Sequence, residues 1–411
     1  MDNNGKSPSD RASDTLAVHA GELPAITNRA SSPPLFQASS YEFEDLEDVE
    51  AIYAGDRPGA IYGRYGGPNA HHFESAIAEL EGAEAAVGAA SGMAAIAAVL
   101  WTSLSAGTPV ICATDLYGGT LALLENDFQQ RGHVRVPVDA TDVQSVEMAF
   151  RKHPSPVLYV EALSNPLMRV VDIPALARVA HAHGALLIVD ATFATPALAR
   201  PLAMGADLVL HSVGKYLGGH GDVGAGVIAG SRERCEPIRQ WLIRNGATIP
   251  HFEAWLGLRG VRTLGLRMAR HAENARVLAA YLAGVEAVAR VYHPSRPDHP
   301  QHALATRLYP HGTGGIVAFD LVGGRAEVEL FVRGLQTISI VHSLGEVAST
   351  ISYSAASSHR SLTPAARVAL GVSDATLRLS CGIEDARDIV ADLERAFAGL
   401  SQAIPATNPS V

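Results

Sequence analysis

The stretch Gly205–Gly226 reads GADLVLHSVGKYLGGHGDVGAG and sets a single lysine, Lys215, in a glycine-rich bend. The apolar run Asp207–Leu210 before the bend predicts a strand covered on both faces. The glycines around Lys215 allow the backbone to approach a ligand closely and to adopt positive φ angles. A lysine that forms a Schiff base needs such surroundings, because partial desolvation lowers the pKa of an ammonium group and makes the amine a nucleophile. A solvated loop lysine is the alternative, and other parts of the chain decide between the two.

Length and composition predict a globular protein of two domains, since the chain has 411 residues, of which 47% are apolar and 18% charged. The net charge of −10 argues against nucleic acid or an anionic membrane as a partner. Cys112, Cys235 and Cys381 lie far apart without C-x-x-C spacing, so neither a disulfide framework nor a cysteine zinc site is expected. No apolar signal core begins the sequence, and no apolar run is long enough to cross a bilayer, which predicts a cytoplasmic location.

Three segments differ in their pattern. Residues 1–64 carry several prolines and little apolar periodicity, so they predict an arm that lies across a neighbouring subunit rather than a domain. Residues 65–265 alternate apolar runs with helical segments, which predicts an α/β domain with a mostly parallel sheet between helices. Residues 266–411 predict a smaller C-terminal α+β domain. The strands expected in the large domain are Ala83–Ala90, Pro109–Ala113, Val134–Val138, Pro156–Glu161, Ala185–Asp190, Asp207–Leu210 and Ala225–Ala229.

Polar side chains follow several of these strands, at the edge where open α/β sheets bind ligands. Ser91-Gly92-Met93 opens a helix directly after a strand, so its N–H groups predict a phosphate site, with a merely short turn as the alternative. Asp190 ends an apolar run, and a buried acid needs a cationic or N–H partner such as a protonated ring nitrogen. Asn165 offers an amide before a proline, and the ring of Tyr117 can lie against a planar ligand.

These parts together are the ones needed to hold pyridoxal phosphate, a cofactor that stabilises carbanions. Two other phosphate motifs are excluded: no G-x-G-x-x-G follows the first strand, and Gly214-Lys215 is followed by Tyr216 where a Walker A motif needs serine or threonine. None of the 17 histidines has H-E-x-x-H spacing, so no metal is expected. A serine nucleophile is not supported either, because the sequence has no G-x-S-x-G elbow.

The chain resembles the transsulfuration family of Cys/Met metabolism enzymes, which depend on pyridoxal phosphate and include cystathionine γ-lyase, cystathionine γ-synthase, methionine γ-lyase and O-acetylhomoserine sulfhydrylase. The resemblance runs from Thr15 to about Leu400 and implies the type I fold of pyridoxal-phosphate-dependent transferases. Besides the Lys215 bend, the matching segments are Ile61-Tyr62-Gly63-Arg64, Ser91-Gly92-Met93, Leu116-Tyr117-Gly118-Gly119-Thr120, Ser164-Asn165-Pro166, Val189-Asp190, Arg259-Gly260, Thr263-Leu264, Ser343-Leu344-Gly345 and Leu377-Arg378-Leu379-Ser380.

The resemblance implies a role for each candidate residue. Lys215 carries the cofactor and then moves protons, Asp190 keeps the pyridine nitrogen protonated, and Tyr117 stacks on the ring and acts as an acid. Asn165 contacts both the phenolic oxygen of the ring and the substrate carboxylate. The other implied contacts are Gly92, Met93 and Ser212 to the phosphate, Tyr62 and Arg64 to the phosphate of the neighbouring subunit, and Ser343 and Arg378 to the substrate carboxylate. A site shared in this way implies at least a dimer, and the family pattern is a homotetramer built as a dimer of dimers.

The implied reaction is γ-elimination or γ-replacement on a γ-substituted L-amino acid derived from homoserine or homocysteine. β-Elimination of cystathionine and a non-catalytic binding subunit are the alternatives. Five residues depart from the family pattern: Gly214 stands for a threonine, Ala191 for an asparagine, Gly221 for a serine, Gly119 for the cysteine of methionine γ-lyases, and His342 for the glutamate with which cystathionine-handling members meet the distal ammonium. These departures leave the substrate open.

Overall fold

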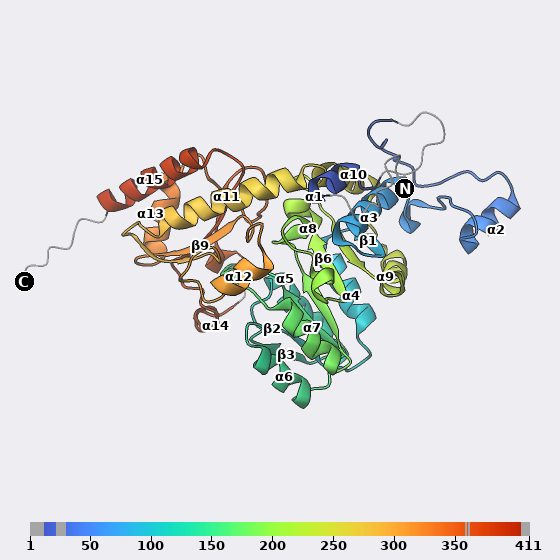
Figure 1. The fold of residues 1–411 in the computed structure, drawn as a ribbon, viewed down its shortest axis with the longest axis horizontal. Helices are drawn as coiled ribbons and strands as arrows, with labels where there is room; N and C mark the ends of the chain where they lie inside the picture. The colour runs from blue at the N-terminus through green and yellow to red at the C-terminus, as the bar shows by residue number, and fades with distance from the viewer. Residues whose placement is uncertain (1–11, 22–29, 358–359, 361, 404–411) are drawn as a thin grey trace, which may run out of the picture. The chain divides into compact units, whose positions relative to one another are not determined.

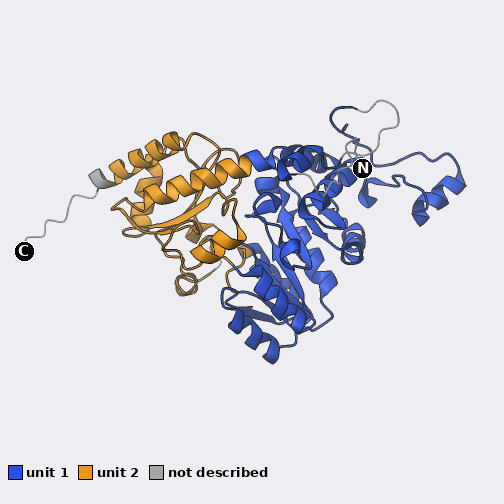
Figure 2. Cartoon of the chain, in the orientation of Figure 1, with its two compact units in different colours: residues 1–113, 119–162, 171–266 blue, residues 114–118, 163–170, 267–411 orange. Residues whose placement is uncertain are grey.

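The computed structural model describes residues 12–21, 30–357, 360 and 362–403. The chain divides into two compact units, drawn in different colours in Figure 2. Unit 1 contains the described residues up to Ala113 together with Gly119–Ala162 and Val171–Leu266. Unit 2 contains Thr114–Gly118, Leu163–Val170 and the described residues from Arg267 onward.

Unit 1 is built on a seven-stranded sheet, of which β1, β2, β3 and β6 are labelled in Figure 1. The order of its strands is β1-β7-β6-β5-β4-β2-β3. Its strands are β1 Ala85–Ala89, β2 Val110–Ala113, β3 Arg135–Val138, β4 Val157–Glu161, β5 Leu186–Asp190, β6 Leu208–Ser212 and β7 Gly226–Gly230. Four of the six pairings are parallel, whereas β7 runs antiparallel to both β6 and β1. The predicted mostly parallel sheet is therefore confirmed, and each strand begins and ends within two residues of its expected position.

The helices of this region begin and end where the sequence provides caps. Ser91 caps α4, Asp142 caps α6 and Asp172 caps α7, each by accepting a backbone N–H of the first turn. Helix α4 packs on β6 and β7, α7 on β5, and α3 and α9 on β1. The full set is α1 Ser13–His19, α2 Leu46–Ala54, α3 Pro68–Glu81, α4 Gly92–Ser103, α5 Gly118–Ala122, α6 Val143–Lys152, α7 Ile173–Ala182, α8 Thr195–Leu198, α9 Arg232–Asn245 and α10 His251–Val261. No helix in the described part of the chain has both the length and the apolar character needed to cross a membrane.

The described part of the N-terminal segment belongs to unit 1. Its helix α1 packs against α3, and its backbone is fixed at two prolines: Trp255 donates to the Pro33 carbonyl at 2.9 Å and Asn69 donates to the Pro34 carbonyl at 2.8 Å. Several of its large apolar side chains remain exposed, namely Leu35, Phe36, Leu46, Tyr53 and Tyr62. The contact of this arm with a neighbouring subunit stays a prediction.

Unit 2 contains a five-stranded sheet in the order β10-β11-β12-β9-β8, in which only the β10–β11 pairing is parallel. Its strands are β8 Val288–Tyr292, β9 Ile316–Leu321, β10 Ser339–Ile340, β11 Thr350–Tyr353 and β12 Thr376–Ser380. The helices from this part of the chain are α11 Leu264–Leu282, α12 His302–Leu308, α13 Arg325–Gly334, α14 Pro364–Ala369 and α15 Ala386–Ala403. The sequence did not predict β8 or β11.

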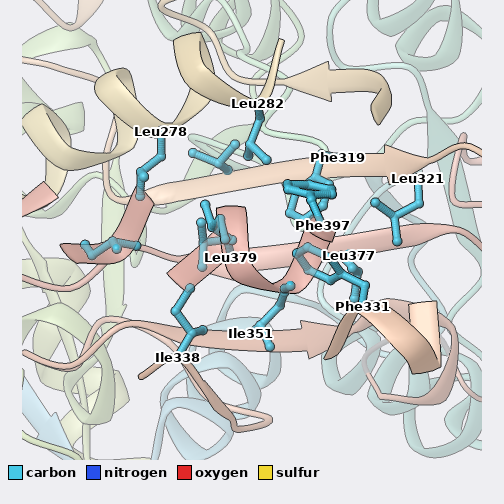
Figure 3. Packing of buried hydrophobic residues seen from close by; sticks show 14 of the residues in the cluster. Leu278, Leu282, Phe319, Leu321, Phe331, Ile338, Ile351, Leu377, Leu379 and Phe397 are labelled. Atoms are coloured by element: carbon cyan, nitrogen blue, oxygen red, sulfur yellow. The ribbon is translucent and has the colours of Figure 1, made fainter. Parts of the chain in front are cut away.

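The core of unit 2 lies between this sheet and three helices (Figure 3). Phe331 of α13 packs edge-on against Phe319 of β9 and lies 4.7 Å from Phe397 of α15, measured between ring centroids. Beside this core the buried Asp392 carboxylate accepts the N–H groups of residues 336, 337 and 338, each at 2.9 Å. This segment leads into β10, and Ser343, a candidate substrate contact, follows three residues after that strand.

Candidate active site

Lys215 lies directly after β6, in the short turn Val213–Leu217. Its backbone leaves the helical region, with φ −105° and ψ −135°, and two hydrogen bonds close the turn around it: Gly218 N–H donates to the Val213 carbonyl and Gly219 N–H to the Lys215 carbonyl, both at 2.8 Å. The lysine is half-buried. The strand and bend predicted from Gly205–Gly226 are therefore present, and the lysine lies at the C-terminal edge of the sheet.

Gly214 has no space for a side chain. A Cβ at this position would lie 2.5 Å from the carbonyl oxygen of Val223, in the segment that returns from the bend toward β7. A threonine here would therefore require the backbone near Val223 to move. The packing of the bend explains why this position departs from the expected threonine.

We expect Gly214→Ser to weaken the binding of pyridoxal phosphate, although it adds a hydroxyl donor beside the predicted phosphate site. The added Cβ would displace the Val223 carbonyl, and such overpacking costs about 1–3 kcal/mol. Gly224→Ser is the matched control, because a Cβ at position 224 meets no atom within 4 Å. Cofactor titration of the apoprotein and thermal unfolding check the prediction, and tighter binding by Gly214→Ser than by the wild type would contradict it.

The N-terminus of α4 lies against β6 and forms an anion cradle. Ser91 Oγ accepts the Ala94 N–H at 3.0 Å, and since the first N–H groups of a helix have no partner within it, those of Gly92 and Met93 face outward. A Cβ at Gly92 would lie 3.0 Å from Ser212 Oγ, so the glycine brings the Ser212 hydroxyl against the helix end. Outward N–H groups, a hydroxyl and the positive end of a helix together suit a phosphate.

Asp190 ends β5, in register with Glu161 of β4 and Leu210 of β6. Its Oδ1 accepts the Thr192 N–H at 2.9 Å, and its Oδ2 lies 3.5 Å from the hydroxyl of Tyr159. Burial raises the pKa of the Asp190 carboxyl, and the hydrogen bonds from Thr192 only partly offset this. A cation at Oδ2, such as a protonated ring nitrogen, would favour the ionised form.

Sequence reasoning missed three groups around these residues. Thr192 Oγ1 accepts the Ser212 N–H at 2.9 Å, and this hydrogen bond connects the segment after Asp190 to the anion cradle. Tyr159 is fully buried beside Asp190. His211 Nε2 is hydrogen-bonded to Glu81 Oε1 of α3 at 2.6 Å, and both side chains are buried. Within the described residues, no three or more His, Cys, Asp or Glu side chains are grouped so that they could hold a metal ion.

Tyr62 and Arg64 belong to unit 1 and lie close to one another. Arg64 Nη1 donates to the Ile243 carbonyl at 3.0 Å, and its guanidinium carbon lies 4.8 Å from the centroid of the Tyr65 ring. Tyr62 is exposed. Their role at the phosphate of a neighbouring subunit stays a prediction.

Unit 2 brings together three of the residues predicted to bind a carboxylate. Arg378 on β12 is 5% exposed; its Nη1 donates to Asn165 Oδ1 and its Nη2 to the Ser343 carbonyl, both at 3.0 Å. A guanidinium held in one plane by two fixed acceptors is prepared for a second, bidentate partner such as a carboxylate. His342 is exposed next to Ser343, and Tyr117, also exposed, directly precedes α5.

The residues of unit 1 fit pyridoxal phosphate. The cradle at α4 and Ser212 matches its phosphate, the Asp190 carboxyl matches its ring nitrogen, and the Lys215 amine matches its aldehyde. These donors and acceptors lie at one edge of the sheet. The individual roles of these residues stay predictions.

Comparison with known proteins gives matches over nearly the whole chain. A model of the family described as Cys/Met metabolism PLP-dependent enzyme matches residues 14–398. O-succinylhomoserine sulfhydrylase from Pseudomonas aeruginosa is 41% identical over 392 residues, 95% of this chain and 96% of that protein. L-methionine gamma-lyase from Pseudomonas putida is 40% identical over 385 residues, 93% of this chain and 96% of that protein. The crystal structure of cystathionine gamma synthase from Xanthomonas oryzae pv. oryzae in complex with aminoacrylate and cysteine superposes with a TM-score of 0.90 at 36% identity, over 96% of this chain and 100% of that chain, which confirms the predicted fold.

Proposed function

The chain belongs to the Cys/Met metabolism PLP-dependent enzyme family, and from this premise we propose that it replaces the γ-substituent of an O-acylhomoserine with a thiol. It is an enzyme of γ-elimination and γ-replacement chemistry that depends on pyridoxal phosphate.

His342, exposed beside Ser343, is the observation that carries the choice of substrate. A histidine can donate a hydrogen bond or carry positive charge toward the terminal carboxylate of a succinyl group. A glutamate there would favour the distal ammonium of cystathionine instead. The similarity to an O-succinylhomoserine sulfhydrylase supports the same choice.

Lys215 and Asp190 would act on the cofactor side of the reaction. When bound, pyridoxal phosphate supplies an electron sink that stabilises negative charge on the substrate carbon next to the amine. Lys215 would hold the cofactor covalently; once released, its amine would remove the Cα proton and then a proton from Cβ, and the electron pair left at Cβ would expel the γ-substituent. Asp190 would keep the ring nitrogen protonated through a charged hydrogen bond.

Arg378, Asn165, Ser343 and Tyr117 would act on the substrate side. Arg378 would bind the α-carboxylate through its planar fork, oriented by Asn165 Oδ1 and the Ser343 carbonyl. The hydroxyl of Tyr117 would donate a proton to the departing acyl oxygen. A thiol would then add at Cγ in replacement, whereas hydrolysis without a thiol would give ammonia and a 2-oxo acid.

A second candidate is γ-elimination of methionine. The 40% identity to an L-methionine gamma-lyase favours it, since it is nearly the same as the identity to the sulfhydrylase. Gly119 argues against methionine as the substrate. Methionine γ-lyases resemble this chain around Tyr117 but carry cysteine at the position of Gly119. Product analysis separates the two candidates.

The test is a substrate panel with purified, cofactor-loaded enzyme. O-succinylhomoserine with sulfide should give homocysteine and succinate, and kcat/KM should exceed that for O-acetylhomoserine. His342→Ala should reduce this preference without changing the rate with O-acetylhomoserine. Faster turnover of methionine to 2-oxobutyrate, ammonia and methanethiol would favour the second candidate, and pyruvate from cystathionine would indicate β-elimination. Cofactor that binds without any turnover across the panel would instead favour a non-catalytic binding subunit.

We propose further that the active enzyme is a homo-oligomer in which the arm of one subunit completes the site of its neighbour, in dimers that pair into a tetramer. The exposed apolar side chains of the arm, including Phe36 and Tyr62, support this arrangement. A site shared across a two-fold axis also has a distinctive genetic consequence, because two defective subunits can form one intact site.

Mixed subunits of Arg64→Ala and Lys215→Ala are therefore expected to regain activity that neither variant has alone. A dimer containing one of each has one doubly defective site and one intact site. Random mixing should therefore restore about a quarter of the wild-type sites. Co-refolding the two variants and measuring turnover checks this, with light scattering for the oligomeric state. Absence of recovery in mixed oligomers would show that Arg64 serves its own subunit or none.

A further inference from the structure

The carboxylate of Asp190 has a neighbour on each oxygen. Oδ1 accepts the Thr192 N–H at 2.9 Å, and the hydroxyl of Tyr159 lies 3.5 Å from Oδ2, the oxygen left for a ring nitrogen. Tyr159 is fully buried on β4, where burial, followed by the charges of Asp190 and Glu161, raises its pKa well above the ordinary value. Its hydroxyl therefore keeps its proton and faces the carboxylate as a donor.

We propose that Tyr159 is a positioning residue, which holds Asp190 ionised and oriented toward the ring nitrogen of the bound cofactor. The proposal rests on the role proposed above for Asp190. The register of β4 and β5 supports it: Tyr159 is paired with Ile188, two residues before Asp190, so the phenol extends along the sheet toward the strand end.

The physical effect follows from sharing one proton between the ring nitrogen and Asp190. A carboxylate with donors on both oxygens is a weaker base, so the proton stays on the ring nitrogen. Without the hydroxyl, Asp190 would be more basic and less constrained, and the proton would shift toward it. The ring would then withdraw fewer electrons, and removal of the Cα proton would slow.

Other charged groups near Asp190 come from both neighbouring strands. From β6, His211, which is hydrogen-bonded to Glu81, acts to lower the pKa of Asp190. From β4, Glu161 is in register with Asp190 and adds negative charge. Lys215 follows on the β6 side. All of these remain in place when only the hydroxyl of Tyr159 is removed.

Tyr159→Phe tests the proposal, because it keeps the ring and removes one oxygen. The variant loses one hydrogen bond to a charged group, and at 3.5 Å this bond is long and therefore weak. We expect kcat to be about three- to tenfold lower and KM to be nearly unchanged. Affinity for pyridoxal phosphate should fall several-fold. The pH midpoint of the cofactor's absorbance change should move upward, because weaker electron withdrawal makes the nitrogen contributed by Lys215 more basic. Tyr309→Phe is the control. It removes the hydroxyl of a buried tyrosine in unit 2, far along the chain from Asp190, and should change only thermal stability.

Asp190→Asn separates this proposal from the proposed function. If Tyr159 acts through Asp190, Tyr159→Phe should have no further effect on the cofactor spectrum or affinity in the Asp190→Asn background. Equal effects in both backgrounds would show a purely structural role and overturn the proposal. If Asp190→Asn alters cofactor affinity and spectrum while Tyr159→Phe does not, the proposal alone fails. If Asp190→Asn alters neither, the role of Asp190 itself is wrong.

Discussion

Lys215→Ala is expected to lower turnover by about a thousandfold or more and to weaken the retention of pyridoxal phosphate. In the roles proposed for Lys215, the variant would lose both the amine that holds the cofactor and the base that moves the Cα proton, and a positioned general base alone contributes about 10²–10⁴-fold. Since alanine is smaller than lysine, Lys215→Ala adds no bulk to the bend, and the fold should persist. Lys215→Arg keeps the positive charge but not the nucleophile, and should be as inactive as the alanine variant.

The position of the cofactor can be established directly, because the chain has only three lysines, Lys6, Lys152 and Lys215. Borohydride reduction should fix the cofactor to one of them, and peptide mass spectrometry should find the label on residue 215. Lys152, exposed in the last turn of α6, supplies the matched control Lys152→Ala, which should retain full activity. Label on Lys6 or Lys152, or near-normal turnover by Lys215→Ala, would overturn the assignment.

The sheet of unit 1 could be predicted closely because most of its strands are largely buried, and β2, β4 and β7 are buried along their whole length. Runs such as Leu186–Asp190 are apolar at nearly every position and end at a charged or glycine residue, so both ends are visible in the sequence. The antiparallel pairing of β7 with β6 and β1 could not be predicted from the sequence. Strand β7 follows β6 through a compact bend instead of a helix, and its pairing with β1 joins residues more than a hundred positions apart.

The strands of unit 2 were harder to predict because their patterns are weaker. Strand β8 has Arg290 at its centre and only a partly buried pattern, and β11 is four residues long within a serine-rich segment. Helix α9 of unit 1 is also hard to recognise in the sequence, because it is rich in charged residues and contains Pro237, which ordinarily indicates a break. In each case packing against neighbouring elements determines the structure, and a single sequence does not show this packing.

Some residues of the candidate site could likewise be predicted from the sequence, and others could not. Lys215, Asp190 and Gly92 are marked locally, by glycines, by the end of an apolar run and by a helix start. Tyr159 and the Glu81–His211 pair have no such mark, because a tyrosine inside an apolar strand resembles any core residue and the pair joins α3 to β6. The steric reason for Gly214 depends on the path of the returning chain at Val223. Local signals thus identify the groups predicted to contact a ligand, whereas the groups packed beside them are found only from long-range contacts.

Arg378→Lys is expected to raise KM for the amino-acid substrate by about a hundredfold, with a smaller effect on kcat. Arg378 donates from both terminal nitrogens to fixed acceptors, Asn165 Oδ1 and the Ser343 carbonyl, which orients its plane. A lysine keeps the charge but offers a point contact instead of two parallel hydrogen bonds, and hydrogen bonds to charged groups contribute about 1.5–3 kcal/mol each. Steady-state kinetics with O-succinylhomoserine measure the effect.

The buried position of Arg378 means that lost stability must be separated from lost binding. Arg367→Lys is a suitable control, because Arg367 is also a largely buried arginine of unit 2, hydrogen-bonded to a carbonyl and to Asp374, and should lose stability without a change in KM. A substrate analogue whose α-carboxylate is replaced by a hydroxymethyl group adds a second criterion. If Arg378 binds that carboxylate, wild type and Arg378→Lys should bind the analogue equally weakly. If the variant still binds it a hundredfold more weakly, the arginine contacts another part of the substrate, and the carboxylate must be held elsewhere.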